Sequence, residues 1–159
     1  VSGDLATDND AQRLRRAGIQ AQAITTGNAC HLDARLVHDA LHHVPWRDLD
    51  LFVIENVGNL VCPAIYDLGQ DANVVALSIT EGEDKPLKYP TMFLRADLVL
   101  LTKMDLAPHL DIDLDAMIGN LAKVMPDPRV IMVSAKTGAG IADWLTWLTA
   151  RRAVIGRAA

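Results

Sequence analysis

The stretch Leu98-Val99-Leu100-Leu101-Thr102-Lys103-Met104-Asp105 decides the fold class, because it joins a short continuous apolar run to a polar loop. Such a run is typical of a strand that is covered on both faces, as in a parallel sheet between layers of helices. Val74 to Ile79 and Leu51 to Ile54 repeat the pattern, so we expect at least three buried strands. Open sheets of this kind carry their functional residues on loops after the carboxyl ends of strands.

Apolar runs and stretches of helical spacing alternate along the whole chain. This alternation predicts an α/β fold with a mostly parallel sheet and helices on both faces. Val1 to Ala6 resembles the end of a strand, and Asn56 to Asn73 is expected to be a loop. The other expected strands are Ile19 to Ile24 and Val130 to Val133. The expected helices are Thr7 to Arg16, Leu32 to His43, Ile112 to Val124 and Gly140 to Arg151. Thr7 and Asp10 are expected to form a capping box at the start of the first helix, and the last helix is expected to carry Ile141, Trp144, Leu145 and Leu148 on one side.

Length and composition favour a single domain over residues 1–159. Half of the 159 residues are apolar, so the core needs neither disulfides nor a structural metal. Fifteen basic against twenty acidic residues give a net charge of −5, which argues against a nucleic-acid partner. No signal peptide and no apolar run of about 18 residues is present. We therefore expect a cytoplasmic protein with reduced thiols and no membrane association.

Two polar motifs follow expected strands and together indicate guanine recognition. Asp105 can accept hydrogen bonds from the N1–H and the exocyclic amine of guanine, a donor pair that adenine lacks. The stem of Lys103 can cover the base, and a backbone N–H near Ala135 can donate to the keto oxygen. Either motif alone fits a solvated loop, but their order and their positions after strands favour a nucleotide site. Its expected residues are Thr102, Lys103, Asp105, Ser134, Ala135 and Lys136.

Asp4, Glu55 and Gly58 are the candidates for Mg²⁺ and water chemistry. Glu55 ends an apolar run, where a carboxylate can hold a magnesium-bound water, and Gly58 can let a backbone N–H turn toward a terminal phosphate. Asp4 can orient the attacking water, although a turn aspartate beside Gly3 is an equal alternative. A strand-end charge in solvent is the alternative for Glu55. The sequence contains no G-x-x-x-x-G-K-[ST] phosphate-binding loop, so phosphate binding by this chain alone is expected to be weak.

Cys30, His31 and Cys62 form a possible metal site. Two thiolates and an imidazole suit Zn²⁺ or Ni²⁺, and an open fourth position suits the transfer of a metal. Spacing alone favours another interpretation, in which the cysteines are small buried residues and His31 is a helix cap. His38, His42 and His43 are expected to lie on a solvated helix face.

Several longer strings resemble those of the hydrogenase maturation GTPases of the HypB family. The resemblance covers Gly3 to about Leu148, and urease and cobalamin metallochaperones of the same superclass lack these strings. They are Ile54-Glu55-Asn56-Val57-Gly58-Asn59-Leu60-Val61-Cys62-Pro63, Thr80-Glu81-Gly82-Glu83-Asp84-Lys85-Pro86-Leu87-Lys88-Tyr89-Pro90, Gly3-Asp4-Leu5-Ala6-Thr7-Asp8 and Cys30-His31-Leu32-Asp33-Ala34.

The resemblance implies a nickel metallochaperone with a three-layer, P-loop NTPase-like GTP-binding domain. It implies GTP or GDP with Mg²⁺ as cofactor, and Ni²⁺ or Zn²⁺ at Cys30, His31 and Cys62. It also implies a nucleotide-dependent homodimer, a HypA-like nickel chaperone as partner, and delivery of nickel to the large subunit of [NiFe] hydrogenase.

The chain departs from the family pattern in several places. Ala29 stands where glycine is usual, and Thr25 and Thr102 stand where asparagine is usual. The first strand and the phosphate-binding loop of the domain are absent, so GTPase activity is expected only with them. A partial sequence and a degenerate copy are both open explanations. The second would leave a nucleotide-independent module that binds Ni²⁺ or Zn²⁺ or docks a partner.

Overall fold

The protein is described by a computed structural model covering residues 1–155, and it divides into two compact units, Val1–Gln70 and Asp71–Ala159. Each unit combines helices with a small parallel sheet. The prediction of an α/β fold with parallel strands is therefore confirmed.

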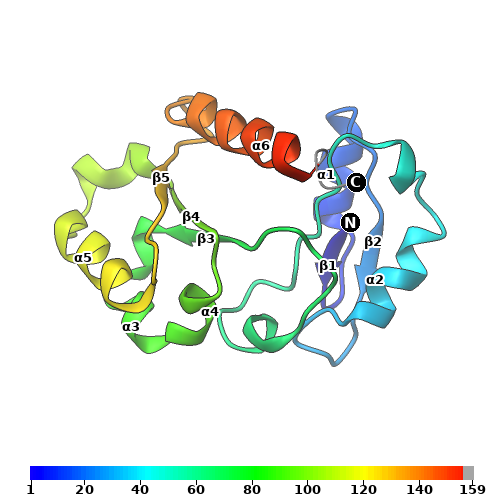
Figure 1. Ribbon diagram of the computed structural model, residues 1–159, viewed down its shortest axis with the longest axis horizontal. Coiled ribbons are helices and arrows are strands. Elements are labelled where there is room, and N and C mark those ends of the chain that lie inside the picture. The colour runs from blue at the N-terminus through cyan, green and yellow to red at the C-terminus, as the bar shows by residue number, and fades with distance from the viewer. Residues whose placement is uncertain (156–159) are drawn as a thin grey trace. The chain divides into compact units, whose positions relative to one another are not determined.

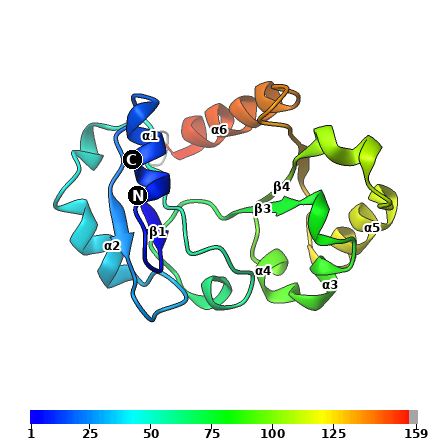
Figure 2. The same ribbon diagram turned by 180° about the vertical axis from the view of Figure 1, so that it is seen from behind.

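Unit 1 is built on two short parallel strands. Strand β1 (Ser2–Asp4) pairs in register with β2 (Ala23–Thr25), and helix α1 (Asn9–Arg16) connects them. Helix α2 (Ala34–Leu41) follows and lies beside β2 (Figures 1 and 2). Two 3-10 turns, η1 (Trp46–Asp48) and η2 (Cys62–Ile65), complete the unit. Its core contains Ile24, Leu32, Val37 and Ala40, with Val1, Leu36, Ile54 and Leu68 packed against them.

The prediction of a buried strand at Leu51 to Ile54 is wrong. These residues are extended but irregular, and only Glu55 makes a bridge, with Ser2 of β1. Ile54 packs on the core, whereas Leu51 and Val53 are 54% and 59% exposed. The continuous apolar run suggested two covered faces, but unit 1 covers this segment on one face only.

The two helices of unit 1 begin at residues other than those predicted. Asp33 accepts a hydrogen bond from the N–H of Leu36, and this N-cap starts α2 two residues later than expected. The predicted Thr7 and Asp10 capping box is wrong. The carboxylate of Asp4 accepts the Thr7 N–H at 2.8 Å, and Asp8 becomes the N-cap residue of α1.

Unit 2 has a three-stranded parallel sheet in the order β3-β4-β5. The strands are β3 (Val74–Ser78), β4 (Leu98–Thr102) and β5 (Val130–Met132), so the strand expected at Leu98 to Leu101 is confirmed. Leu98, Val99 and Leu101 are at most 1% exposed. The remaining elements are η3 (Ile79–Glu81), α3 (Lys85–Lys88), α4 (Pro90–Leu94), η4 (Met104–His109), α5 (Leu114–Val124) and α6 (Ile141–Ile155).

Helices α3 and α5 pack side by side in unit 2 (Figure 2), and Met117 and Leu121 of α5 are fully buried. Helix α6 differs from expectation on one point. Trp144 and Leu148 are partly buried, but Leu145 is 55% exposed, so it does not belong to the packed side. Among residues 1–155, no helix is both long enough and apolar enough to cross a membrane.

Candidate metal centre and guanine-binding loops

Three extended segments of unit 1 end at the same edge and place the candidate residues there. Strand β1 lies between β2 and the segment at Glu55, because Gly3 donates to the Glu55 carbonyl and Glu55 donates to the Val1 carbonyl. All three run parallel, so the loops that follow them start from a common side. The loop after β2 carries Cys30 and His31, and the loop after Glu55 carries Cys62.

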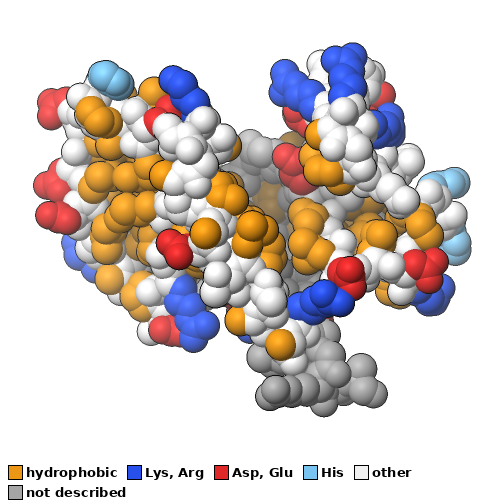
Figure 3. All heavy atoms as spheres, turned by 90° about the horizontal axis from the view of Figure 1, so that it is seen from above, with side chains coloured by type: hydrophobic (Ala, Val, Ile, Leu, Met, Phe, Trp, Pro, Cys, Tyr) orange, Lys and Arg blue, Asp and Glu red, His pale blue; other side chains and the backbone are white. Residues whose placement is uncertain are grey.

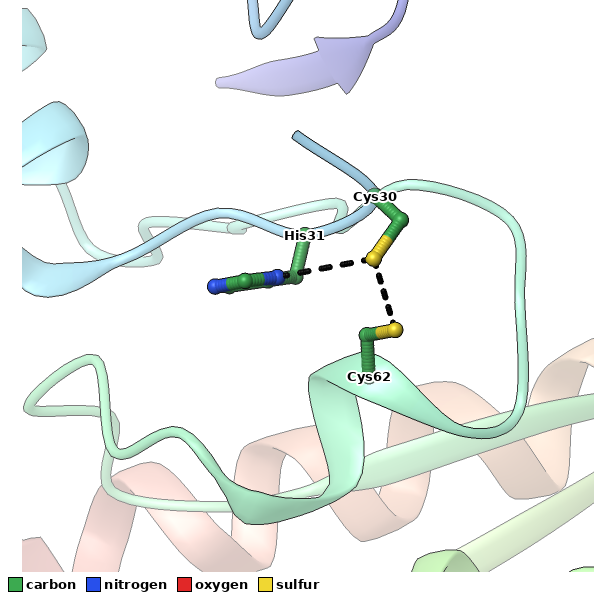
Figure 4. A group of neighbouring side chains, drawn as sticks. All are labelled: Cys30, His31 and Cys62. Atoms are coloured by element: carbon green, nitrogen blue, oxygen red, sulfur yellow. Dashed lines mark hydrogen bonds between the residues drawn. The ribbon is translucent and has the colours of Figure 1, made fainter. Parts of the chain in front are cut away.

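The two loops bring Cys30, His31 and Cys62 together (Figure 4). The Sγ atoms of Cys30 and Cys62 are 2.6 Å apart, and the Cys30 Sγ lies 3.7 Å from the His31 Nδ1. One ligand atom from each residue lies within 4.8 Å of the others. Cys30 is exposed and Cys62 is partly exposed, both as free thiols. The alternative that these cysteines are small buried core residues is therefore wrong.

The donor chemistry fits a soft or borderline divalent metal ion. The hydrogen bond with Cys30, together with desolvation, raises the pKa of the Cys62 thiol from its ordinary value. The Cys62 thiol must therefore lose its proton before its sulfur can bind a metal ion. Metal-to-sulfur bonds of about 2.3 Å in a tetrahedral site place the two sulfurs about 3.8 Å apart. Binding therefore requires the sulfurs to separate by roughly 1 Å, which exposed side chains accommodate by small rotations.

Tyr66 fixes the plane of the His31 ring. The two rings stack with centroids 3.8 Å apart and planes inclined by 14°. Tyr66 follows η2, the turn that carries Cys62, so one short segment supplies both a candidate ligand and the support for another. Stacking of this kind limits rotation of the imidazole without using either ring nitrogen.

Two asparagines join the cysteine loops, and the sequence analysis missed both. Asn56 Oδ1 accepts the N–H groups of Leu32 and Val57 at 2.8 and 2.9 Å. Asn59 Oδ1 accepts the N–H of Cys62 at 2.9 Å, while its Nδ2 donates to the Cys30 carbonyl. Asparagine is common in turns, so no signal in the sequence distinguished these two from ordinary loop residues.

We expect Asn59→Ala to weaken metal binding at the cysteine cluster by about 10- to 100-fold, the usual effect of losing a residue that orients a ligand. The substitution removes the bonds that hold the Cys30 carbonyl and the Cys62 N–H to one side chain. Competition with a chromophoric chelator measures the change. Asn59→Asp is the matched control, because it keeps an acceptor for the Cys62 N–H and should retain part of the affinity. Equal affinity in wild-type protein and Asn59→Ala would contradict this role.

The carboxylates at the same edge already have partners. Asp4 Oδ1 accepts the N–H groups of Ala6 and Thr7 at 2.9 and 2.8 Å, and these bonds lower its pKa. Glu55 is exposed and accepts the Ser2 hydroxyl at 2.7 Å. Gly58 is exposed, and an added Cβ there would meet no atom within 4 Å. Asp4 thus closes a turn through Oδ1, and Glu55 binds the Ser2 side chain through Oε2.

The two expected guanine motifs meet in unit 2. The Ser134 hydroxyl donates to Asp105 Oδ1 at 2.6 Å, and Lys136 Nζ lies 4.0 Å from Asp105 Oδ2. Thr102 is the last residue of β4, and the N–H of Met104 donates to the Val133 carbonyl at 3.2 Å. Lys103, Ala135 and Lys136 are exposed. The arrangement holds the Asp105 carboxylate between the Ser134 hydroxyl on one oxygen and the Lys136 ammonium near the other.

Lys103 has a φ of 62°, in the left-handed region that non-glycine residues seldom adopt. Among the described residues it is the one non-glycine position with positive φ. The conformation turns the chain sharply between Thr102 and Asp105. Such strain persists where the surrounding structure imposes it, and it is common at binding sites.

We expect Ser134→Ala to raise the pKa of Asp105 toward its ordinary 3.8, because the Ser134 hydroxyl is the main cause of its lowered pKa. A lowered pKa in the folded state adds stability above pH 3.8, and that stability is lost as the pH falls through the folded-state pKa. The stability gap between wild-type protein and Ser134→Ala should therefore narrow in acid. NMR titration of the Asp105 carboxyl and urea unfolding measure both effects.

The control for this prediction is the same substitution in an Asp105→Asn background. There the pH-dependent part of the stability gap should vanish, because the titrating group is gone. An unchanged Asp105 titration in Ser134→Ala would contradict the prediction.

Comparison with known proteins identifies the family. The profile described as "CobW/HypB/UreG, nucleotide-binding domain" matches residues 1–132. The hydrogenase maturation factor HypB of Azotobacter chroococcum mcd 1 is 53% identical over 152 residues, covering 96% of this chain and 50% of the relative. The HypB of Escherichia coli (strain K12) is 49% identical, covering 96% of this chain and 52% of the relative. The chain thus spans about half the length of these relatives.

Two solved structures share the fold. HypB from Helicobacter pylori in complex with nickel has a TM-score of 0.90 and 39% identity, covering 95% of this chain and 72% of that one. HypB from Archaeoglobus fulgidus has a TM-score of 0.85 and 40% identity, covering 95% of this chain and 73% of that one. These matches confirm the resemblance inferred from the sequence strings, and the chain belongs to the CobW/HypB/UreG family, within which its relatives are HypB hydrogenase maturation factors.

Proposed function

We propose that this chain is the nickel-handling, guanine-nucleotide-binding part of a hydrogenase maturation factor. The observation that carries the proposal is the cluster of Cys30, His31 and Cys62, whose ligand atoms lie within 4.8 Å of one another. In this proposal residues 1–159 belong to one GTP-binding domain of the three-layer, P-loop NTPase-like class.

The metal is the cargo of the protein. Two thiolates and one imidazole provide three donors that suit Ni²⁺ or Zn²⁺, and the nickel complex of the Helicobacter pylori relative supports Ni²⁺. A fourth donor comes from water or from the second chain of a homodimer. A site with three protein ligands keeps one position open, and an open position allows a second ligand to take the metal by exchange.

The proximity of Glu55 and Cys62 in the sequence suggests how nucleotide and metal are coupled. Glu55, Gly58 and Cys62 belong to a single segment, which Asn56 and Asn59 hold against the Cys30 loop. Asp4 and Glu55 would bind Mg²⁺ or water beside the nucleotide, and Gly58 would approach the terminal phosphate. A shift of this segment on phosphate loss would then change the separation of the two sulfurs.

The guanine base would bind at the second unit. Asp105, oriented by Ser134, would accept the two donors of guanine, and a backbone N–H near Ala135 would donate to its keto oxygen. Lys103 and Lys136 would cover the base, and Thr102 would end the strand that carries the loop.

The proposed partners are a HypA-like nickel chaperone and the large subunit of [NiFe] hydrogenase, in the cytoplasm.

The test of nucleotide recognition uses the chain itself. We expect GDP, added during NMR, to shift the backbone amides of Lys103 to Asp105 and Ser134 to Lys136, and ADP at the same concentration to leave them unshifted. Asp105→Asn should reverse the preference toward xanthosine diphosphate, because an amide can donate to the carbonyl that xanthine carries in place of the guanine amine. An equal response to GDP and ADP would contradict guanine recognition.

A nucleotide-independent metal module is the second candidate. The cysteine cluster favours it, because two thiols and an imidazole can bind a metal ion without any nucleotide. Metal binding through the cysteine cluster together with no response to GDP would support this candidate over the first.

A further inference from the structure

Helix α2 carries a second group of side chains that can bind a metal ion, and this group consists of histidines and contains no cysteine. His42 lies four positions after His38 in the sequence, and both side chains are exposed. His42 is the C-cap of α2 with φ −68° and ψ −14°, so the helical geometry continues through it. Histidine side chains gather at the surface over α2 (Figure 3). We infer that His38 and His42 form a second site, which chelates a borderline divalent transition-metal ion such as Ni²⁺ or Zn²⁺.

The spacing and the ring geometry both fit chelation. Side chains four residues apart on a helix lie one above the other, which is why two such histidines can bind one zinc ion. The two rings have centroids 5.0 Å apart and planes inclined by 89°. With metal-to-nitrogen bonds of about 2.1 Å, the ring centres of two ligands lie about 4.5 Å apart for a right angle at the metal and about 5.2 Å for a tetrahedral angle. The observed separation falls between these values.

The surroundings leave room for the ion and its remaining ligands. Both histidines line an open hollow of about 510 Å³, in which water can complete the coordination sphere. The Asp48 carboxylate also lines the hollow and adds negative charge. Arg47, the one cation among the lining residues, lies over the Trp46 ring with its guanidinium carbon 4.5 Å from the ring centroid.

The donor chemistry selects the class of metal. Neutral imidazoles bind Ni²⁺, Zn²⁺ and Cu²⁺ well, whereas Mg²⁺ and Ca²⁺ prefer oxygen ligands. Two protein ligands hold an ion more weakly than a closed site does. The inference goes beyond the proposed function, because this site uses neither thiols nor nucleotide. Its role would be to hold a second, more readily exchanged ion on the same unit.

The test separates the two sites with a Cys30→Ser/Cys62→Ser variant titrated with NiCl₂. We expect wild-type protein to bind two equivalents, and the thiol variant to retain one. His38→Gln or His42→Gln, added singly to the thiol variant, should weaken the retained equivalent by about tenfold or more, since each removes one arm of the chelate. His43→Gln is the matched control. It is exposed, but it lies beyond the C-cap of α2 and outside the residues that line the hollow, so it should have no effect.

Proton NMR of the thiol variant provides a readout that does not depend on the substitutions. Paramagnetic Ni²⁺ should broaden the ring signals of His38 and His42 before those of His43 and His109. Retention of no equivalent by the thiol variant, or an equivalent that survives both His38→Gln and His42→Gln, would overturn the inference. Because the thiols are absent from this experiment, its failure leaves the cysteine cluster untouched.

Discussion

Cys62→Ala should weaken Ni²⁺ binding at the cysteine cluster by about 100-fold or more, because it removes a ligand rather than a residue that orients one. The remaining Cys30 thiolate and His31 imidazole come from adjacent residues and leave two of four positions to water. The thiolate-to-nickel charge-transfer absorption should fall with the loss of one sulfur. Titration followed by this absorption reports on the cluster alone, since ions bound only by imidazoles lack the band.

Three further variants make this result interpretable. Cys30→Ala should match Cys62→Ala, and the double variant should abolish the absorption. Leu60→Ala alters the same loop without removing a metal donor and serves as the control for disturbance of the segment. The unfolding temperature should change little in Cys62→Ala, because the side chain is partly exposed. Unchanged Ni²⁺ affinity in Cys62→Ala would end the assignment of the cluster as a metal site.

Gly140→Ala should destabilise unit 2 by about 3 kcal/mol or more, through a backbone clash together with a strained backbone conformation. Gly140 has a φ of 72°, and a Cβ added there would lie 1.9 Å from the Met132 carbonyl oxygen and 3.0 Å from its carbon. Because the oxygen belongs to the backbone of β5, no side-chain rotation relieves the contact. Urea unfolding followed by tryptophan fluorescence measures the loss, because Trp144 and Trp147 both lie in helix α6 of unit 2.

The clash should also reach the loop that we propose to bind guanine. Ser134 donates its N–H to the Ala139 carbonyl at 3.0 Å, next to Gly140, and its hydroxyl orients Asp105. Moving Gly140 away from Met132 therefore moves the partner of Asp105, and we expect the response to GDP to be lost along with stability.

Gly138→Ala is the matched control for Gly140→Ala. Gly138 also has positive φ, 81°, but an added Cβ would meet no atom within 4 Å. It should therefore cost only the strain of a left-handed alanine, about 1–2 kcal/mol. Equal losses in the two variants would show that conformation alone, and not the contact with Met132, restricts Gly140.

Local patterns determined the parts of the fold that depend on neighbours in sequence. Leu98 to Leu101 is continuous and apolar, and it forms the central strand of its sheet, in which Leu98, Val99 and Leu101 are buried. The polar residues after it and after β5 were expected to cooperate, and Ser134 does contact Asp105. The alternation of strands and helices likewise predicted the α/β class, because each element shows its own period.

Burial by distant segments could not be predicted from the same patterns. Leu51 to Ile54 has the apolarity of a covered strand, yet Val53 is 59% exposed, since coverage depends on what packs against it. In the same way, spacing alone favoured buried cysteines. Cys30 and Cys62 meet only because two parallel segments end at one edge and two asparagines join their loops.

The sequence by itself determined which chemistry is available: two thiols, an imidazole, an aspartate that we predict to bind guanine, and the strings that mark the family. The tertiary structure alone decided which of these groups meet, at which separations, and which carboxylates already have hydrogen-bond partners. The physical reason is the separation along the chain over which each kind of interaction acts. Helix and strand periods act over a few residues, whereas a ligand set 32 positions apart is assembled by sheet register and by side-chain bonds between loops.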